Sequence, residues 1–304
     1  WWSALSLLRS TASSPAAAAA TLSTRAASVE AHDEARADAL GAAQLLDQIE
    51  DDALDSADST PGALIDDDAS TSTEARALRA MRRRALELAA DASSDTKLAL
   101  VTAEVKKLLK AGFSPILFCR FIPTAHYVAE HLRTALKDVP IDVITGELPS
   151  EERAERVAQL KERAADKPKV LVATDCLSEG VNLQDAFQAV VHVDLAWAPS
   201  RHEQREGRVD RFGQPSPTVK ALLVYGEDNG IDGIVLEVLL RKHEKIRRDL
   251  GISVPVPPQS DAILAALLEG ILLRGKDADQ LTLDLDVEPG LLAYLAQHVV
   301  VEVD

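Results

Sequence analysis

Four arginines lie close together in the segment RHEQREGRVDRFGQ, residues 201–214. On a helix, intervals of four, three and three residues place side chains along one edge. Guanidinium groups bind phosphate oxygens through paired, charge-assisted hydrogen bonds. The segment therefore predicts a helix with a phosphate-binding edge formed by Arg201, Arg205, Arg208 and Arg211.

The same segment has a simpler interpretation. Acidic residues lie between the arginines, so a solvated helix face with salt bridges explains the same pattern: Glu203, Glu206 and Asp210. Gly207, however, lies inside the predicted helix, where glycine costs about 1 kcal/mol relative to alanine. A helix that serves only solubility does not need it. We expect the helix to begin at Ser200, its N-cap, and to end at Gly213.

Two other segments place polar groups after apolar ones. ATDCLSEGVNLQ (residues 173–184) follows the apolar KVLVA (residues 169–173), and Gly180 would let a ligand approach the backbone. Such a loop binds phosphate or sugar hydroxyls, or it is an ordinary capped loop. The apolar segment PILFCRF (residues 115–121) carries Arg120 near its end. We expect this cation at the same rim as the polar loop.

These segments belong to a regular alternation of short apolar stretches and amphipathic helices. Strands of about five residues separated by longer helices indicate a parallel sheet with crossover helices, an α/β fold. Continuous apolar strands indicate that both faces are covered, and ligands bind beyond the carboxyl ends of such strands. The predicted strands are 115–121, 141–144, 169–173, 189–194 and 219–225, and the predicted helices include 74–90, a helix capped by residues 93–95 that ends at 110, 124–136, 150–164 and 234–249.

The composition divides the chain further. We expect a helical segment (1–50), an acidic flexible insertion (51–73), an α/β domain (74–226), a helical extension with a proline-rich linker (227–258) and an acidic C-terminal segment (259–304). The chain begins with tryptophan rather than methionine, so we expect it to be part of a longer protein.

The net charge of −16 is concentrated in two segments. Residues 30–68 carry thirteen acidic residues and one arginine, and residues 277–304 carry seven acidic residues and no basic ones. The rest of the chain is therefore slightly positive, and the global charge does not exclude phosphate binding. The acidic segment 30–68 is either a solvated insertion or an autoinhibitory mimic of DNA. Two unpaired cysteines and the lack of a long apolar run predict a cytoplasmic protein without a metal site.

Taken together, three segments resemble the motifs of a known family. PILFCRF, VLVATDCLSEGVNLQ and HEQREGRVDRFGQ, in this order and spacing, are similar to motifs IV, V and VI of the second RecA-like lobe of superfamily-2 helicases. The last segment resembles the Swi/Snf-type double-stranded-DNA translocases in particular. Among these, it resembles the bacterial members that include the RNA-polymerase-recycling ATPase and phage-defence helicases. The resemblance covers residues 96–225 and implies a RecA-like sheet with helical flanks.

The resemblance implies an ATP site shared with another lobe. Arg208 and Arg211 match the motif VI arginines that reach the ATP γ-phosphate as arginine fingers, and Gln204 matches the glutamine that opens this motif. Gly180 and Asn182 match motif V positions near the nucleotide, although Asn182 replaces the aspartate of some relatives.

The resemblance also implies contacts with a nucleic-acid backbone. Thr145, Gly146 and Thr174 match positions that follow this backbone, and Arg120 is a weaker candidate for the same groove. Contacts of this kind bind phosphates and give affinity without sequence information.

No G-x-x-x-x-G-K-[ST] segment and no acidic magnesium box after a strand occur in the sequence. The resemblance therefore implies that ATP and Mg²⁺ are bound mainly by an upstream RecA-like lobe, and that this chain does not hydrolyse ATP alone. The implied partners are double-stranded DNA, that lobe and other proteins of a transcription or defence complex, with no membrane. Two alternatives remain open: a non-catalytic RecA-like binding module, whose arginine helix docks an acidic partner, and an RNA helicase lobe.

Overall fold

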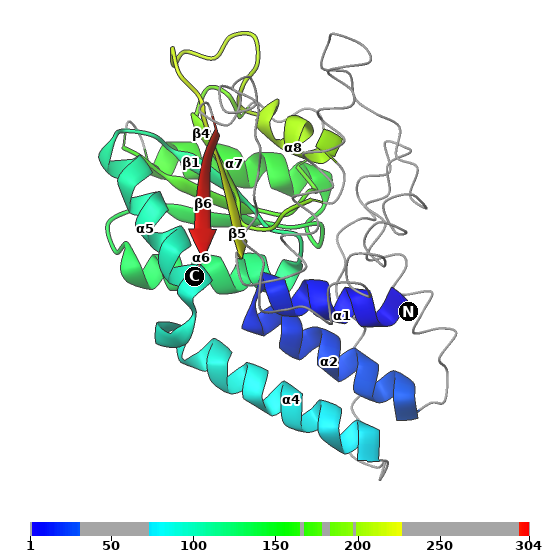
Figure 1. Cartoon of the computed structure of the whole chain (residues 1–304). Coiled ribbons are helices and arrows are strands. Elements are labelled where there is room, and N and C mark those ends of the chain that lie inside the picture. The colour runs from blue at the N-terminus through cyan, green and yellow to red at the C-terminus, as the bar shows by residue number, and fades with distance from the viewer. Residues whose placement is uncertain are drawn as a thin grey trace, which may run out of the picture.

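The computed structural model describes residues 2–30, 73–164, 167–177, 183–196, 199–226 and 298–303 (Figure 1). Within these residues, one parallel sheet has the strand order β2-β3-β1-β4-β5-β6. The strands are β1 (Pro115–Phe118), β2 (Ile141–Ile144), β3 (Val170–Ala173), β4 (Ala189–His192), β5 (Lys220–Gly226) and β6 (His298–Val303). The predicted α/β fold with a parallel sheet is confirmed, and the five predicted strands lie within a few residues of the observed ones.

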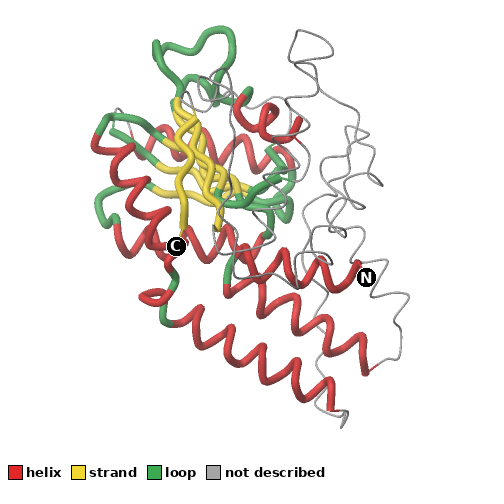
Figure 2. The backbone as a smooth tube through the Cα atoms, viewed as in Figure 1, coloured by secondary structure: helices red, strands yellow, loops and turns green. Residues whose placement is uncertain are grey.

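Helices lie on both sides of the sheet, and more helices extend from one edge (Figure 2). They are α1 (Trp2–Ser13), α2 (Pro15–Glu30), α4 (Thr73–Ala90), α5 (Thr96–Lys110), α6 (Ile122–Ala135), α7 (Ser150–Ala164) and α8 (Pro199–Glu206), with a short 3₁₀ helix at Ala92–Ser94. The arrangement is therefore a helix–sheet–helix sandwich with a helical extension.

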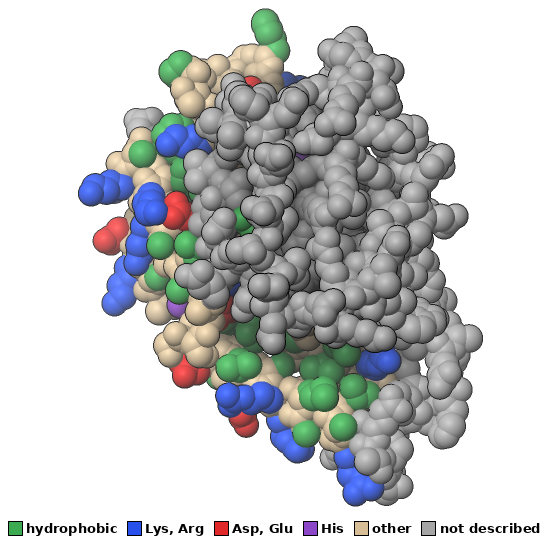
Figure 3. All heavy atoms as spheres, in the orientation of Figure 1, with side chains coloured by type: hydrophobic (Ala, Val, Ile, Leu, Met, Phe, Trp, Pro, Cys, Tyr) green, Lys and Arg blue, Asp and Glu red, His purple; other side chains and the backbone are tan. Residues whose placement is uncertain are grey.

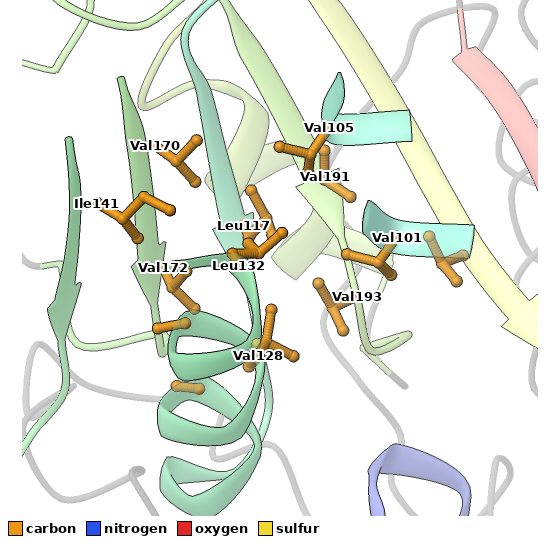
Figure 4. Packing of buried hydrophobic residues seen from close by; sticks show 14 of the residues in the cluster. Val101, Val105, Leu117, Val128, Leu132, Ile141, Val170, Val172, Val191 and Val193 are labelled. Atoms are coloured by element: carbon orange, nitrogen blue, oxygen red, sulfur yellow. The ribbon is translucent and has the colours of Figure 1, made fainter. Parts of the chain in front are cut away.

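Alternating side chains of each strand enter two separate cores. On one face, Leu117 of β1 packs with residues of α5 and α6, including Val105 and Leu132 (Figure 4). On the other face, the neighbouring Ile116 and Phe118 pack with residues of α7 and of the segments 176–177 and 183–187. The two faces are both covered, which explains why the strands are continuously apolar rather than alternating.

Local signals set the ends of the crossover helices. The Asp95 side chain accepts a hydrogen bond from the Leu98 N–H at 2.8 Å and so caps the start of α5. At the other end, Gly112 has φ of 84°, and the Phe113 N–H donates to the Leu108 carbonyl at 3.0 Å. This is a Schellman ending, which needs a residue that adopts positive φ easily.

The helical extension comprises α1, α2 and α4. Ser14 caps α2, because its Oγ accepts a hydrogen bond from the Ala17 N–H at 3.1 Å, and Pro15 occupies the first position of the helix. Small side chains then let α2 pack closely on α4, through Ala18, Ala19 and Leu22 on one side and Leu78 and Ala85 on the other.

Two features of the fold differ from the sequence predictions. Strand β6 pairs in parallel with β5, although we expected no strand in residues 259–304. The arginine helix ends at Glu206, well before Gly213, and residues 207–213 form turns. The predicted helix 234–249 lies outside the described residues, and the predicted domain boundaries remain predictions. Among the residues described, no helix is long and apolar enough to cross a membrane.

Candidate functional site

The loops that follow β2 and β3 bring together three of the residues predicted to contact nucleic acid. Thr145 and Gly146 follow β2 directly, and Thr174 follows β3. Because these strands are parallel neighbours, their carboxyl ends meet at one edge of the sheet. The Thr145 and Thr174 side chains are buried there, and only Gly146 is partly exposed. Gly180 and Asn182 lie outside the described residues.

Arg153 of α7 joins these two loops. Its guanidinium donates to the carbonyl oxygens of Leu148 at 2.7 Å, Cys176 at 2.8 Å and Gly146 at 3.4 Å. The side chain is buried. One arginine thus fixes the backbone on both sides of the predicted groove. Sequence analysis missed this role, because Arg153 is one of several charged residues on an ordinary amphipathic helix.

Arg120 does not lie at the rim as we expected. Its residue is 2% exposed, and its backbone N–H donates to Asp194 Oδ2 at 2.8 Å. Its charge acts inward, since it is one of the cations that lower the pKa of Asp175. The cation at the end of β1 is therefore buried and not exposed at the rim: Arg120 belongs to a buried set of charges under the strand ends, and its contact with nucleic acid remains a prediction.

The four arginines do not share one exposed edge either. Arg201 and Arg205 are buried, whereas Arg208 is partly exposed and Arg211 is exposed. The difference arises because α8 lies against the sheet edge with these two arginines on its inner side. Gln204, predicted to help set the interlobe site, lies exposed on the outer side of the same helix.

Arg205 forms the strongest polar contact of the site. Its Nε donates to Asp175 Oδ1 at 2.6 Å, and its Nη2 donates to Asp175 Oδ2 at 3.0 Å. Burial would raise the pKa of Asp175, but the charge and hydrogen bonds of Arg205 hold that pKa well below its ordinary value. The pair is therefore ionised at any physiological pH, and neither partner is available to a ligand.

His192 and Glu206 brace the last turn of α8. His192 Nε2 lies 3.1 Å from Glu206 Oε1, and His192 Nδ1 lies 3.5 Å from Arg205 Nη1. Burial lowers the pKa of His192, which favours the neutral ring. In the tautomer that fits both neighbours, Nδ1 accepts from Arg205 and Nε2–H donates to Glu206. His192 is thus a packed structural histidine.

Residues 207–213, which follow α8, are called the arginine turn below. Several residues other than the arginines determine its conformation. A Cβ on Gly207 would lie 3.1 Å from the Glu203 carbonyl oxygen, and Gly213 has φ of 93°. Val209 is fully buried in the core. The Gln214 amide donates to the carbonyls of Phe187 at 3.0 Å and Val209 at 2.9 Å.

The exposed side chains of the arginine turn are the ones that can contact a ligand. Arg211 is exposed, Arg208 is partly exposed, and Phe212 is fully exposed beside them. Their backbone is anchored, because the Arg208 N–H donates to the Arg205 carbonyl at 3.3 Å and the Gln214 N–H donates to the Arg211 carbonyl at 3.0 Å. The turn thus presents two cations on a tied backbone.

Asp194 links this site to the N-terminal helices. Its carboxylate accepts hydrogen bonds from Lys97 Nζ at 2.8 Å and Ser13 Oγ at 2.9 Å, and its carbonyl accepts from Arg205 Nη1 at 3.0 Å. Burial would raise the pKa of Asp194, but Lys97 and the other donors lower it. Asp175 and Asp194 each follow an apolar strand closely, a sequence signal that we did not use to select them.

Comparison with known proteins identifies this architecture. Residues 97–213 match the family model described as helicase conserved C-terminal domain. This part of the chain is a helicase C-terminal domain. The predicted resemblance to the second lobe of these enzymes is confirmed. The match includes α5 to α8 and the arginine turn, but not α1, α2 or α4.

Two relatives each match part of this chain. YqhH of Bacillus subtilis, named as an uncharacterized ATP-dependent helicase, is 44% identical over 55 residues, which are 18% of this chain and 10% of the relative. The Drosophila melanogaster SWI/SNF-related matrix-associated actin-dependent regulator of chromatin subfamily A-like protein 1 is 28% identical over 156 residues, 51% of this chain and 20% of the relative. The chain therefore spans a fifth or less of the length of these relatives.

Among solved structures, the Sulfolobus solfataricus SWI2/SNF2 ATPase core domain is similar to this chain. The two have 19% sequence identity and a TM-score of 0.37, and the similarity covers 56% of this chain and 33% of that one.

Proposed function

We propose that this chain is the second motor lobe of an ATP-dependent translocase that moves along double-stranded DNA. In this proposal, Arg208 and Arg211 are arginine fingers that act on ATP bound mainly by an upstream RecA-like lobe. The observation that carries the proposal is the arginine turn. Within a helicase C-terminal domain, the buried Val209 and the hydrogen bonds of the Gln214 amide hold this turn, and Arg208 and Arg211 lie on its outer side beside the exposed Asp210 and Phe212.

The chemistry of such a turn fits phosphoryl transfer. The transferred phosphoryl group gains negative charge on its oxygens as it moves, and a fixed cation beside those oxygens lowers the barrier. An arginine finger contributes about 10³–10⁵ in rate. A tied backbone supports this role, because a cation that is already in place needs no reorganisation during the reaction.

The acidic residues of the site are committed to cations of this chain. Asp175 binds Arg205, and Asp194 binds Lys97. Among the residues that the structure describes, no group of three or more His, Cys, Asp and Glu side chains could hold a metal ion. We therefore assign Mg²⁺, like most of the ATP contacts, to the upstream lobe.

The loops after β2 and β3 support the nucleic-acid part of the proposal. Arg153 holds both loops, so that backbone groups around Gly146 lie at a fixed position on the sheet edge. We propose that Gly146, with Thr145 and Thr174 shaping the loops beneath it, follows the phosphate backbone of one DNA strand. ATP-driven closure of two lobes that grip the same backbone then produces stepping.

The test is duplex-DNA-stimulated ATPase activity of the full-length protein. Arg211→Ala should lower kcat by about 10³-fold or more, because it removes a finger, while DNA binding is retained. The matched control is Arg83→Ala, in which the same residue type is removed from an exposed helix outside the helicase C-terminal domain. Its kcat should equal that of the wild type. Unchanged turnover in Arg211→Ala would contradict the proposal and favour a non-catalytic binding module, and stimulation by duplex RNA alone would favour an RNA helicase.

A further inference from the structure

The arginine turn has no strand or helix of its own to fix it against the sheet. The buried Val209 and the amide of Gln214 fix its later part, and the last turn of α8 fixes its start. In that last turn of α8, Arg205 binds the strand ends. The Arg208 N–H donates to the Arg205 carbonyl. The position of Arg205 therefore contributes to the position of the Arg208 backbone.

Arg205 contacts the ends of three adjacent strands. Its guanidinium binds both oxygens of Asp175 after β3, the carbonyl of Asp194 after β4, and lies 5.5 Å from the centre of the Phe118 ring at the end of β1. The side chain is 3% exposed. Three contacts in different directions leave the guanidinium one position, which a flexible ammonium cannot reproduce.

The Asp194 contact extends this control beyond the helicase C-terminal domain. Ser13 Oγ donates to the Asp194 carboxylate and lies 2.7 Å from Thr124 Oγ1, while Arg9 Nη2 lies 3.4 Å from the Leu195 carbonyl oxygen. The end of α1 thus packs partly on Asp194, whose carbonyl also accepts a hydrogen bond from Arg205. A buried polar network of this kind fixes one arrangement when all its members are satisfied.

We infer that Arg205 is a positioning residue for the reaction: held by Asp175, Asp194 and Phe118, it sets Arg208 at the distance from the strand ends that catalysis requires. This inference rests on the proposed function. Arg205 does not touch ATP; it acts through the arginine turn. The regular spacing of the four arginines does not reveal this difference in role. Arg205 supports the arginine turn, whereas Arg208 and Arg211 of the turn act on ATP.

The experiment is a double-mutant cycle on the full-length protein with Mg²⁺-ATP and linear duplex DNA. Arg205→Lys keeps the charge but loses the paired geometry, so we expect kcat to fall by about 10- to 100-fold, the effect of a displacement near 1 Å. The KM for ATP should change by less than about twofold, since a finger displaced only in the transition state leaves ground-state binding intact. In an Arg208→Ala background, the same change should have little further effect on kcat.

A merely structural role gives a different result. If Arg205→Lys lowers kcat by the same factor with and without Arg208→Ala, the two residues act independently and the inference is overturned. If Arg208→Ala alone leaves kcat unchanged, the finger role itself fails, which would overturn the proposed function as well. The melting temperature of each variant separates loss of folded protein from loss of activity.

A second variant keeps the test decisive if Arg205→Lys does not fold. Phe118→Leu removes only the ring beside the guanidinium and keeps an apolar side chain in the core. We expect it to lower kcat by less than Arg205→Lys, with the same dependence on Arg208. An effect of Phe118→Leu on kcat that is equal in the Arg208→Ala background would overturn the inference.

Discussion

The arginines at the carboxyl ends of the strands and those of α4 differ in burial and in their partners. Arg153 and Arg205 are buried, and each binds several groups from different loops. The α4 helix also carries five arginines, but those in its central turns are exposed at the surface of the helical extension (Figure 3). The buried guanidiniums decide the shape of the site, because their partners are fixed. The exposed ones have the surrounding solvent as an alternative partner.

Among the changes considered, removal of the Asp175 carboxylate should lower the free energy of unfolding most, because it leaves a buried arginine unpaired. Asp175→Ala leaves Arg205 buried without its carboxylate, and breaking one partner of a buried pair costs about 3–5 kcal/mol. We expect a loss of that size in the free energy of unfolding, measured by urea denaturation. Arg205→Met in the same chain should restore part of it, because the unpaired charge is then gone.

The same pair predicts a direction for pH dependence. The pKa of Asp175 is lowered on folding, so its stabilising contribution is fully present above the ordinary aspartate pKa of about 4 and is lost as the pH falls below it. The wild type should therefore lose stability faster than Asp175→Ala as the pH drops through this range. Equal slopes for the two proteins would mean that folding does not lower the pKa of Asp175.

Substitution of Arg153, which holds the loops after β2 and β3 together, should have a smaller effect on stability. Arg153→Lys keeps the charge, but an ammonium cannot reach the three carbonyls of Leu148, Cys176 and Gly146 together. Loss of one or two such hydrogen bonds to a charged donor costs about 1.5–3 kcal/mol. We also expect DNA-stimulated ATPase to need more DNA for half-maximal activation. Normal DNA dependence with lowered stability would show that the clamp supports the fold but not the DNA contact.

Sequence reasoning reached the sheet more easily than the site. Strand and crossover helices follow from hydrophobic patterns that span several residues, such as the KVLVA strand, and these were placed within a few residues. The end of α8 was not, because the intervals of Arg201, Arg205, Arg208 and Arg211 fit a continuous helix. The buried Val209 lies four residues after the buried Arg205, where a continued helix would also place it on the inner side, so the pattern of the sequence does not reveal the end of α8 at Glu206.

The burial of Arg205 and Arg120 could not be predicted from the spacing of charged residues either. A pattern of charges on a helix does not reveal which side faces the sheet, and Arg205 and Arg120 were expected at the surface. The decisive residue is Asp175, whose carboxylate binds Arg205 and also interacts with the charge of Arg120. Strand β6 has a different cause: its sequence, HVVVEV, is an obvious strand candidate, but its pairing with β5 joins segments more than seventy residues apart.

Replacement of exposed arginines of α4 should have the smallest effect on stability. It tests whether exposed arginines are dispensable where buried ones are not. Arg83 is exposed, and among the described residues it forms no hydrogen bond or ion pair that would be lost. Surface substitutions of this kind change stability by about 0.5 kcal/mol or less. We expect Arg83→Ala to match the wild type in urea denaturation and in kcat. A loss of more than 1 kcal/mol would mean that exposure does not separate the two classes of arginine in this protein, and that α4 depends on its charges as the sheet edge does.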